Sequence, residues 1–199
     1  SIYETTFEEY DFFCEKTGRI PPNDEKWGDR KKRPVINITW KEAYEYTKWL
    51  SNETGEKYRL PTEAEWEFMA RGGTSSRYWW GNKLDKNSEN RAACDSCGGP
   101  FGWDADRRTA PVGKYPSNQF GVFDTVGNVW EWTCSLYSNK YTGEDFTCAD
   151  PPQNGKRIVI RGGAWDEPAV NNRSSTRKGE YPDRKKNTIG FRVVKDLHQ

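Results

Sequence analysis

The chain has 199 residues, which is enough for one domain with a buried core, and we expect a single domain over 1–199. Its formal net charge of +1 argues against a nucleic acid or an anionic membrane as the main partner. No apolar stretch reaches membrane-spanning length and no signal-peptide pattern begins the sequence, so we expect no membrane insertion and assign no compartment. The single histidine, His198, precedes the last residue. A single histidine next to the end of the chain argues against Ser-His-Asp and Cys-His catalysis, histidine zinc sites and two-histidine iron sites.

Large aromatic side chains dominate the apolar part of the composition. Hydrophobic residues make up only 33% of the chain, whereas Phe, Trp and Tyr make up 15%. Eighteen Gly and eleven Pro accompany them. Since each large ring buries much area, this balance predicts aromatic packing beneath long, irregular loops.

Capping boxes, in which a Thr stands three residues before a Glu, predict the helices of the first third of the chain. Each predicted helix ends at a glycine: Thr6–Glu9 to Gly18, Thr39–Glu42 to Gly55, and Thr62–Glu65 to Gly72. Short extended segments are expected at 34–38, 57–60, 129–133, 157–161 and 190–194. From Gly73 to Thr109 the sequence is rich in Gly, Asn, Asp and Ser, which predicts a long ordered loop without a helix. Early helices, short strands and long loops indicate an α+β domain.

Five cysteines are too few for a disulfide scaffold. Cys94 and Cys97 form a lone CxxC, which is a disulfide, a redox pair, or half of a zinc site that Cys14 and another cysteine would complete. Cys134 and Cys148 flank a polar loop, and we expect a disulfide to close it. Cys14 lies beside the apolar face of the first helix, where a free, buried cysteine fits as a small hydrophobe.

The stretch from Gly121 to Trp132 carries two carboxylates, Asp124 and Glu131, on either side of a predicted turn at Gly127 and Asn128. Carboxylates together with inward-pointing carbonyls form an all-oxygen ligand set, which suits a hard cation such as Ca²⁺. The alternative is a buried turn whose acids accept hydrogen bonds from backbone N–H groups.

The same stretch resembles the Gly-[Leu/Phe]-[Tyr/Phe]-[Asp/Asn]-x-x-Gly-Asn-x-Trp-Glu-Trp signature of the formylglycine-generating-enzyme (sulfatase-modifying factor) family. Further pieces that resemble the family follow in its order at 58–68, 70–72, 80–82, 110–112, 161–163 and 190–192. The resemblance implies a C-type-lectin-like fold of the formylglycine-generating-enzyme type, with few helices, short strands and long ordered loops.

The resemblance also implies two structural calcium sites. The positions that match the first site are Asp124, the carbonyls of Gly127 and Val129, and Glu131. Those that match the second are Asn90, the carbonyl of Arg91, Asp104, and Asp106 through its carbonyl. We therefore expect bound Ca²⁺.

The catalytic positions of the family are replaced in this chain. In the enzymes of the family, two cysteines five residues apart follow a Gly-Gly pair and bind copper, and the corresponding positions here are Glu167 and Asn172. Soft Cu(I) requires thiolate or thioether ligands, so we expect no copper and no oxidation of a substrate cysteine. The iron-dependent sulfoxide synthases of the family use His ligands, which this chain lacks. An enzyme of unassigned chemistry, similar to the cysteine-free pyoverdine-tailoring relatives, is the alternative.

The segment 165–186 is almost wholly polar and lies between two framework pieces, 161–163 and 189–193. This arrangement resembles the variable proteins of diversity-generating retroelements, which display diversified side chains near the C-terminus. It implies a non-catalytic, monomeric display protein that binds a protein or another surface ligand. The predicted ligand-binding residues are Trp165, Asp166, Glu167, Asn171, Asn172, Arg173, Lys178, Glu180 and Tyr181. An ordinary solvated loop is the plainer interpretation.

Overall fold

The computed structural model describes residues 1–83, 90–102, 106–141, 143–149 and 155–196. Its α-helices are α1 (Phe7–Thr17), α2 (Trp40–Thr54) and α3 (Glu63–Arg71), and short 3₁₀ helices lie at η1 (Arg30–Lys32), η2 (Glu144–Phe146) and η3 (Ala169–Asn171). The strands are β1 (Tyr58–Arg59), β2 (Trp130–Leu136), β3 (Ile158–Arg161), β4 (Arg177–Glu180), β5 (Ile189–Gly190) and β6 (Val194–Lys195). None of the helices in these ranges is long and apolar enough to cross a bilayer.

Each α-helix begins at the capping box that the sequence predicts. Thr6, Thr39 and Thr62 each accept a hydrogen bond from the N–H of the Glu three positions later, and the carboxylate of that Glu accepts one from the N–H of its Thr. A glycine in the left-handed region follows each helix, as at Gly18 with φ +69°. Local sequence signals therefore determine where these helices begin and end.

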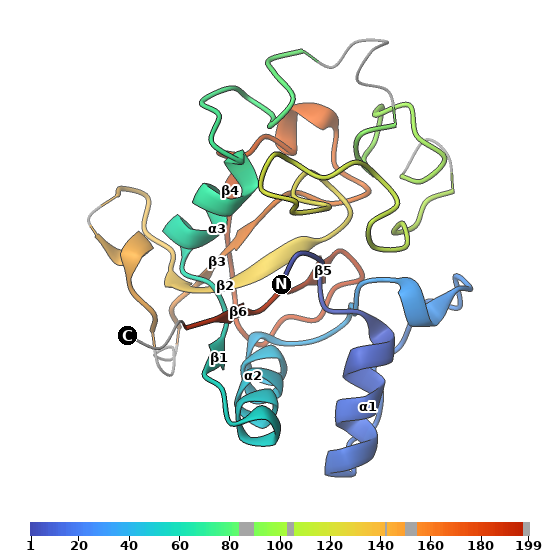
Figure 1. Cartoon of the computed structure of the whole chain (residues 1–199), viewed down its shortest axis with the longest axis vertical. Coiled ribbons are helices and arrows are strands. Elements are labelled where there is room, and N and C mark those ends of the chain that lie inside the picture. The colour runs from blue at the N-terminus through green and yellow to red at the C-terminus, as the bar shows by residue number, and fades with distance from the viewer. Residues whose placement is uncertain (84–89, 103–105, 142, 150–154, 197–199) are drawn as a thin grey trace.

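The central sheet has the strand order β4-β3-β2-β5, and a second sheet pairs β1 with β6. Strands β2, β3 and β4 are antiparallel neighbours, whereas β5 runs parallel to β2. Figure 1 shows α1 and α2 at one end of the molecule and the long loops at the other, with the central sheet between them. Helix α3 packs on β2 and β3. The architecture is the α+β arrangement that the sequence predicts.

The core between the sheet and the first two helices is aromatic, as the composition predicts. The ring of Phe191 lies edge-on to Tyr10 and Tyr46, with centroids 6.3 and 5.3 Å away. The indole N–H of Trp40 donates to the carbonyl of Thr133 at 2.8 Å, which ties α2 to β2. Aromatic side chains thus position the helices relative to the sheet.

The extended segment predicted at 34–38 is not a strand. Pro34 makes one isolated bridge, to Thr6, and the backbone turns at Asn37, where φ is +59°. The Asn37 amide donates to the carbonyl of Asn23 at 3.0 Å and to Glu25 at 2.8 Å. Hydrogen bonds from the Asn37 side chain to the loop at Asn23 and Glu25 thus hold this segment, and strand pairing does not.

One further strand prediction needs correction, and one strand was not predicted. The segment 190–194 is divided between two sheets, because β5 pairs with β2 and β6 pairs with β1. Strand β4 was not predicted, since its sequence, Arg-Lys-Gly-Glu, is polar. It pairs with β3 through backbone groups, with Ile160 opposite Lys178, and this pairing requires no particular side chain.

The cysteine predictions are confirmed. Disulfides join Cys134 to Cys148 and Cys94 to Cys97, and Cys14 is free and buried on α1. The CxxC pair therefore closes a loop and holds neither a zinc ion nor a free dithiol.

Candidate functional site

The turn between Asp124 and Glu131 is held together by Asn128. The Asn128 side chain accepts from the N–H of Ala110 at 2.8 Å and donates to Glu4 at 2.6 Å. Asp124 and Asn128 adopt left-handed backbone conformations, with φ +56° and +62°. The sequence identified Asn128 only as a turn residue, because its partners lie far away along the chain.

Buried acids surround this turn. Glu131 is fully buried, and Arg192 donates to both of its oxygens at 2.7 Å. Trp66 donates to the same carboxylate at 2.7 Å. Burial and the neighbouring Asp124 carboxylate raise the pKa of Glu4 well above its ordinary value. Burial also raises the pKa of Asp124 to about 6.

The first predicted calcium set fits a cation in part. Asp124 Oδ1 is buried without a hydrogen-bond partner, while Oδ2 accepts from the N–H of Gly113 at 2.7 Å. The buried guanidinium of Arg192 is paired with Glu131, and not with Asp124. A cation bound at Asp124 would therefore offset the charge of that buried carboxylate. Glu131 is already engaged by Arg192. No group of three Asp, Glu, His or Cys side chains within the described ranges is arranged to hold a metal.

Of the second predicted calcium set, the structure describes Asn90, Arg91 and Asp106. Asn90 and Asp106 are exposed, and Asp106 forms an ion pair with Arg108 at 2.8 Å. Asp104 lies outside the described residues, and Arg91 is partly buried, with its guanidinium 5.6 Å from the ring centroid of Trp79.

The loop between β3 and β4 (residues 162–176, the η3 loop) carries most of the predicted ligand-binding residues. Neighbouring loops hold its backbone. The N–H of Asp95, which lies between the cysteines of the CxxC disulfide, donates to the carbonyl of Glu167 at 3.0 Å. The hydroxyl of Tyr78 donates to the carbonyl of Ala169 at 2.9 Å. The long loop 73–109 thus supports the η3 loop from one side.

A buried arginine supports the second half of the η3 loop. The guanidinium of Arg161, which is fully buried on β3, donates to the carbonyls of Ser175 and Thr176 at 3.0 Å. Arg161 also forms an ion pair with Glu67 on α3, and Glu63 lies 3.6 Å away. The backbone of the loop is therefore fixed by the sheet and by α3 together.

Asn172 lies inside the η3 loop and not on its surface. Its side chain is fully buried and donates to the carbonyls of Glu167 at 2.9 Å and Pro168 at 3.0 Å. A Cβ at Gly163 would lie 1.7 Å from Asn172 Oδ1, so the missing side chain at Gly163 makes room for it. Asn172 is therefore not part of the exposed surface that we predicted for this segment.

Trp165 and Glu180 are also buried, so they do not form the exposed surface that we predicted. The Trp165 indole donates to the carbonyl of Asn187 at 3.2 Å, and its ring lies edge-on to Trp27, with centroids 5.5 Å apart. Glu180 forms an ion pair with Lys186 and accepts from the N–H of the next residue at 3.0 Å. Both side chains therefore contact other residues of the domain and are not presented to solvent.

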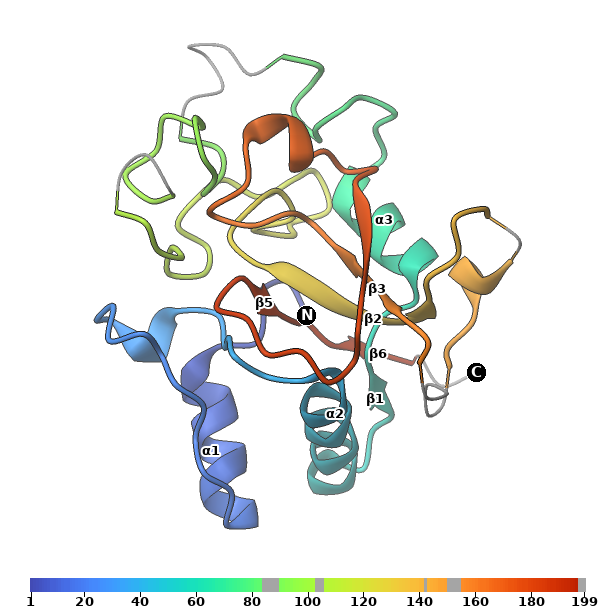
Figure 2. The same cartoon turned by 180° about the vertical axis from the view of Figure 1, so that it is seen from behind.

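Tyr181 is 46% exposed but lies beyond β4, away from the η3 loop. It follows β4, which runs from the η3 loop towards α2 (Figure 2). The next residue, Pro182, accepts a hydrogen bond from the first residue of α2, Trp40, at 3.0 Å. Tyr181 therefore lies at the α2 end of β4.

The remaining predicted residues form one polar surface, which we call the η3 face: Asp166, Glu167, Asn171, Arg173 and Lys178. Glu167 lies at its centre, because it accepts from the Asn171 amide at 2.9 Å and its other oxygen lies 3.9 Å from the Lys178 ammonium. The face thus carries both signs of charge, together with amide donors and acceptors.

Apolar residues beside the η3 face were not predicted as part of it. Val170, within η3, is 53% exposed. Trp79 and Trp80 are partly exposed and, like Ala169, pack against the buried cluster that contains Tyr78 and Val126. The Tyr-Trp-Trp run at 78–80 in a polar loop is the sequence signal for these aromatic residues.

The two positions of the family's cysteine pair support the loop and its surface. Glu167 lies on the η3 face and Asn172 lies beneath it. Four of the five cysteines are in disulfides, and the remaining one, Cys14, is buried on α1 at the other end of the molecule. No thiol is available at these positions to bind a soft metal.

Comparison with known sequences gives the family. The model of the sulfatase-modifying factor enzyme 1-like domain matches residues 1–197. The formylglycine-generating enzyme of Streptomyces coelicolor is 36% identical over 178 residues, which cover 84% of this chain and 54% of that protein. The inactive C-alpha-formylglycine-generating enzyme 2 of Bos taurus is 37% identical over 168 residues, which cover 81% of this chain and 50% of that protein. The chain spans about half the length of these relatives.

Solved structures show the same fold. PvdO from Pseudomonas aeruginosa aligns with a TM-score of 0.86 at 29% identity, over 99% of this chain and 79% of that one. Treponema denticola variable protein 1 aligns with a TM-score of 0.74 at 23% identity, over 96% of this chain and 83% of that one. These likenesses confirm the C-type-lectin-like α+β fold that the motifs imply. The chain belongs to the sulfatase-modifying factor enzyme 1-like domain family, which includes the formylglycine-generating enzymes.

Proposed function

We propose that this domain is a non-catalytic ligand-binding domain that presents the η3 face to a protein or another surface ligand, as the variable proteins of diversity-generating retroelements do. The observation that carries the proposal is the presence of Glu167 and Asn172 at the two cysteine positions. Asn172 ties the loop together from within, and Glu167 joins the side chains of the outer surface. At the two cysteine positions, Glu167 thus joins a polar surface and Asn172 supports it from beneath.

The η3 face has the properties of a recognition surface. Its backbone is held by Arg161, Tyr78 and Asp95, so binding costs little loop ordering. Its side chains offer charges of both signs and amide groups, and Val170 adds an exposed apolar contact. The fold-level likeness to a Treponema denticola variable protein supports a display function.

A peptide selection tests this proposal. Peptides selected from a random phage-displayed library on the wild-type domain should lose at least about tenfold in affinity for the variant Asp166→Ala/Asn171→Ala/Lys178→Ala. That variant should melt within about 2 °C of the wild type, because all three side chains are exposed.

The matched control is Glu8→Ala/Lys16→Ala/Asn52→Ala, which removes the same three chemical types from exposed positions on α1 and α2. The control should retain peptide affinity. If the control loses affinity and the η3 variant retains it, the proposed surface is wrong.

A chemical assay tests the non-catalytic part. Purified protein incubated with Cu(I), oxygen and a cysteine-containing peptide should leave the peptide mass unchanged. Protein-dependent oxidation of the peptide would overturn the proposal. We also expect a monomer in sedimentation.

An enzyme of unassigned chemistry is the second candidate, and the 36% identity to the formylglycine-generating enzyme of Streptomyces coelicolor favours it. In that case Glu167 is the titratable group at the catalytic position. Mass spectrometry of a small-molecule extract would then show a protein-dependent change that Glu167→Gln abolishes. No such change is expected from a display domain.

We propose in addition that a structural Ca²⁺ binds at the turn of Asp124, Gly127, Val129 and Glu131, and that a second ion binds near Asn90. The partnerless Oδ1 of Asp124 supports the first site, since a hard cation would supply the missing contact. An ion there would brace the turn from which β2 begins.

A further inference from the structure

Two arginines at the edge of the η3 loop come from distant parts of the sequence. Arg173 belongs to the loop itself, and its Nε donates to the carbonyl of Val170 at 2.7 Å. Arg77 belongs to the loop that follows α3, and its carbonyl accepts a hydrogen bond from the N–H of Ser174 at 2.9 Å. The fold therefore places these two residues, which we call the arginine pair, on neighbouring loops.

Both guanidinium groups lie near the hydroxyl of Tyr78. That hydroxyl donates to the carbonyl of Ala169 at 2.9 Å, and the next carbonyl along the chain is the one that Arg173 binds. Burial raises the pKa of Tyr78, and the charges of Arg173 and Arg77 oppose the rise. The arginine pair thus presents its two positive charges at one part of the surface.

The positive charge of the arginine pair is not offset by neighbouring acids. Within the described part of the chain, neither arginine forms an ion pair. The sequence has no Asp or Glu at 68–83 or at 168–179. Glu67, which precedes the first of these segments, is engaged by Arg71 and Arg161.

The acids of the η3 face are balanced by lysines. A Glu167 oxygen lies 3.9 Å from the ammonium of Lys178. Burial raises the pKa of Asp166, and the charges of Lys178 and Lys186 oppose the rise. The uncompensated charge of this region therefore belongs to the arginine pair.

Exposed apolar surface borders the arginine pair. Val170, whose carbonyl binds Arg173, is 53% exposed. Trp80 is partly exposed and stacks on the ring of Tyr78, with centroids 4.8 Å apart. Unpaired guanidinium groups beside apolar surface suit a ligand that carries a carboxylate next to an aromatic side chain.

We propose that the ligand of the η3 face is an acidic protein segment. A carboxylate of the segment binds the arginine pair, and a neighbouring aromatic side chain packs against Val170 and Trp80. The inference rests on the proposed function of this face and names the class of ligand. It also adds Arg77, which lies outside the predicted set, as a residue that determines specificity.

Two matched peptides test the inference in a ¹H–¹⁵N NMR titration of the whole domain. The acidic probe is acetyl-Gly-Gly-Glu-Phe-Glu-Gly-Gly-amide, and its counterpart has Gln in place of both Glu residues. The acidic peptide should shift the indole signal of Trp80 and the amide signal of Val170. We expect the Gln peptide to bind at least about fivefold more weakly, because it cannot form ion pairs with the two arginines.

Charge removal at the arginine pair should abolish the preference for the acidic peptide. Arg77→Gln/Arg173→Gln should bind both peptides equally, whereas Arg77→Lys/Arg173→Lys should keep part of the preference. Arg173 also binds a carbonyl of its own loop, so the single variant Arg77→Gln is needed as well. The Arg77 side chain makes no hydrogen bond within the described residues, and its loss alone should lower the preference about twofold.

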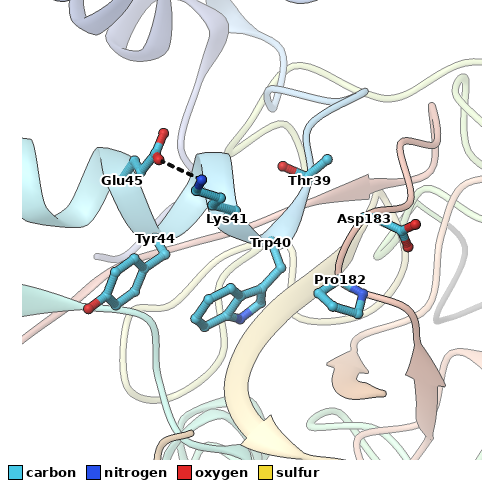
Figure 3. A pocket seen from close by; sticks show the side chains of 7 residues that line it. All are labelled: Thr39, Trp40, Lys41, Tyr44, Glu45, Pro182 and Asp183. Atoms are coloured by element: carbon cyan, nitrogen blue, oxygen red, sulfur yellow. Dashed lines mark ion pairs between the residues drawn. The ribbon is translucent and has the colours of Figure 1, made fainter. Parts of the chain in front are cut away.

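The matched control is Arg157→Gln/Arg184→Gln, which removes two exposed arginines outside the η3 loop and should keep the preference. A second control is the apolar groove at the beginning of α2, where Figure 3 shows the rings of Tyr44, Trp40 and Pro182 side by side. The amide signal of Tyr44 should not shift. Equal affinities of the wild type for the two peptides, or shifts confined to this groove, would overturn the inference.

The peptides selected from the random library separate this inference from the proposed function. They should contain more Asp and Glu than Lys and Arg, and should lose affinity for Arg77→Gln/Arg173→Gln. If they lose affinity only for Asp166→Ala/Asn171→Ala/Lys178→Ala, the η3 face binds ligands and the inference is wrong. If they keep their affinity for both variants, the proposed function fails and the inference fails with it.

Discussion

Asn172 occupies the space that Gly163 leaves open, and a Cβ at position 163 would lie 1.7 Å from its Oδ1. Gly163 also has φ +79°, a conformation that other residues adopt at a cost. Gly163→Ala should therefore lower the free energy of unfolding by about 3 kcal/mol or more. Asn172→Ala should lower it by about 1–3 kcal/mol, because the amide links two carbonyls of the loop.

Asn171→Ala is the matched control for Asn172→Ala, since the neighbouring amide is exposed. Its effect on urea unfolding should be within about 0.5 kcal/mol. Equal effects at the two positions would show that Asn172 does not hold the loop.

The pair of Glu131 and Arg192 joins β2 to the segment after β5, and both side chains are fully buried. Glu131→Gln leaves the buried guanidinium without its counter-charge, so we expect a loss of about 3–5 kcal/mol in the free energy of unfolding. Glu8→Gln removes the acid of an exposed pair with Lys31 and should cost no more than about 1 kcal/mol. Chemical unfolding of both variants, each compared with the wild type, measures the difference.

Calcium should raise the melting temperature of the domain relative to chelator-treated protein. A ligand that binds only the native state stabilises it by about 2.7 kcal/mol at a hundredfold excess over its Kd. Asp124→Asn should reduce this shift, because Asp124 carries the partnerless oxygen, whereas Asp106→Asn should leave the first site intact. An unchanged midpoint, together with no calcium in elemental analysis, would contradict both sites.

The carboxylate of Glu65 should make the domain sensitive to acid. Arg59 donates to both of its oxygens at 2.6 Å and holds the pKa of Glu65 below its ordinary value. The contribution of this pair is therefore present above about pH 4.3 and is lost as the pH falls through the lowered pKa. Because the Glu65 side chain is 42% exposed, we expect a loss of roughly 0.5–1 kcal/mol.

The variant Glu65→Gln tests this, because Gln at the same helix position can keep the capping box. The difference in stability between the wild type and the variant should shrink between pH 6 and pH 3. If the difference in stability stays constant between pH 6 and pH 3, the ion pair with Arg59 does not contribute, and the loss in the variant comes from the capping box alone.

Local signals made much of the fold predictable from the sequence. The capping boxes at Thr6, Thr39 and Thr62 act within a single turn, so they determine the helix starts without help from the rest of the chain. Strand β4 was missed because its pairing with β3 depends on backbone groups and not on an apolar pattern.

The candidate site was only partly predictable, because contacts between distant residues decide which side chains are exposed. Asn172 is buried because Gly163 has no side chain and leaves room for it. Glu131 is paired with Arg192, which lies 61 positions away along the chain, so the spacing of nearby residues does not reveal the pair. The polar character of both residues suggested ligand contacts. Their burial follows from tertiary packing, which composition and spacing do not encode.

The support of the η3 loop has a consequence for how the domain can evolve. Asp95 and Tyr78 reach the loop through the carbonyls of Glu167 and Ala169, and Arg161 reaches it through further carbonyls. Every amino acid has a backbone carbonyl, so these contacts survive when the outward side chains change. Mutational tolerance is therefore concentrated at the exposed positions of the loop, and one rigid domain can acquire new surface chemistries by substitution alone.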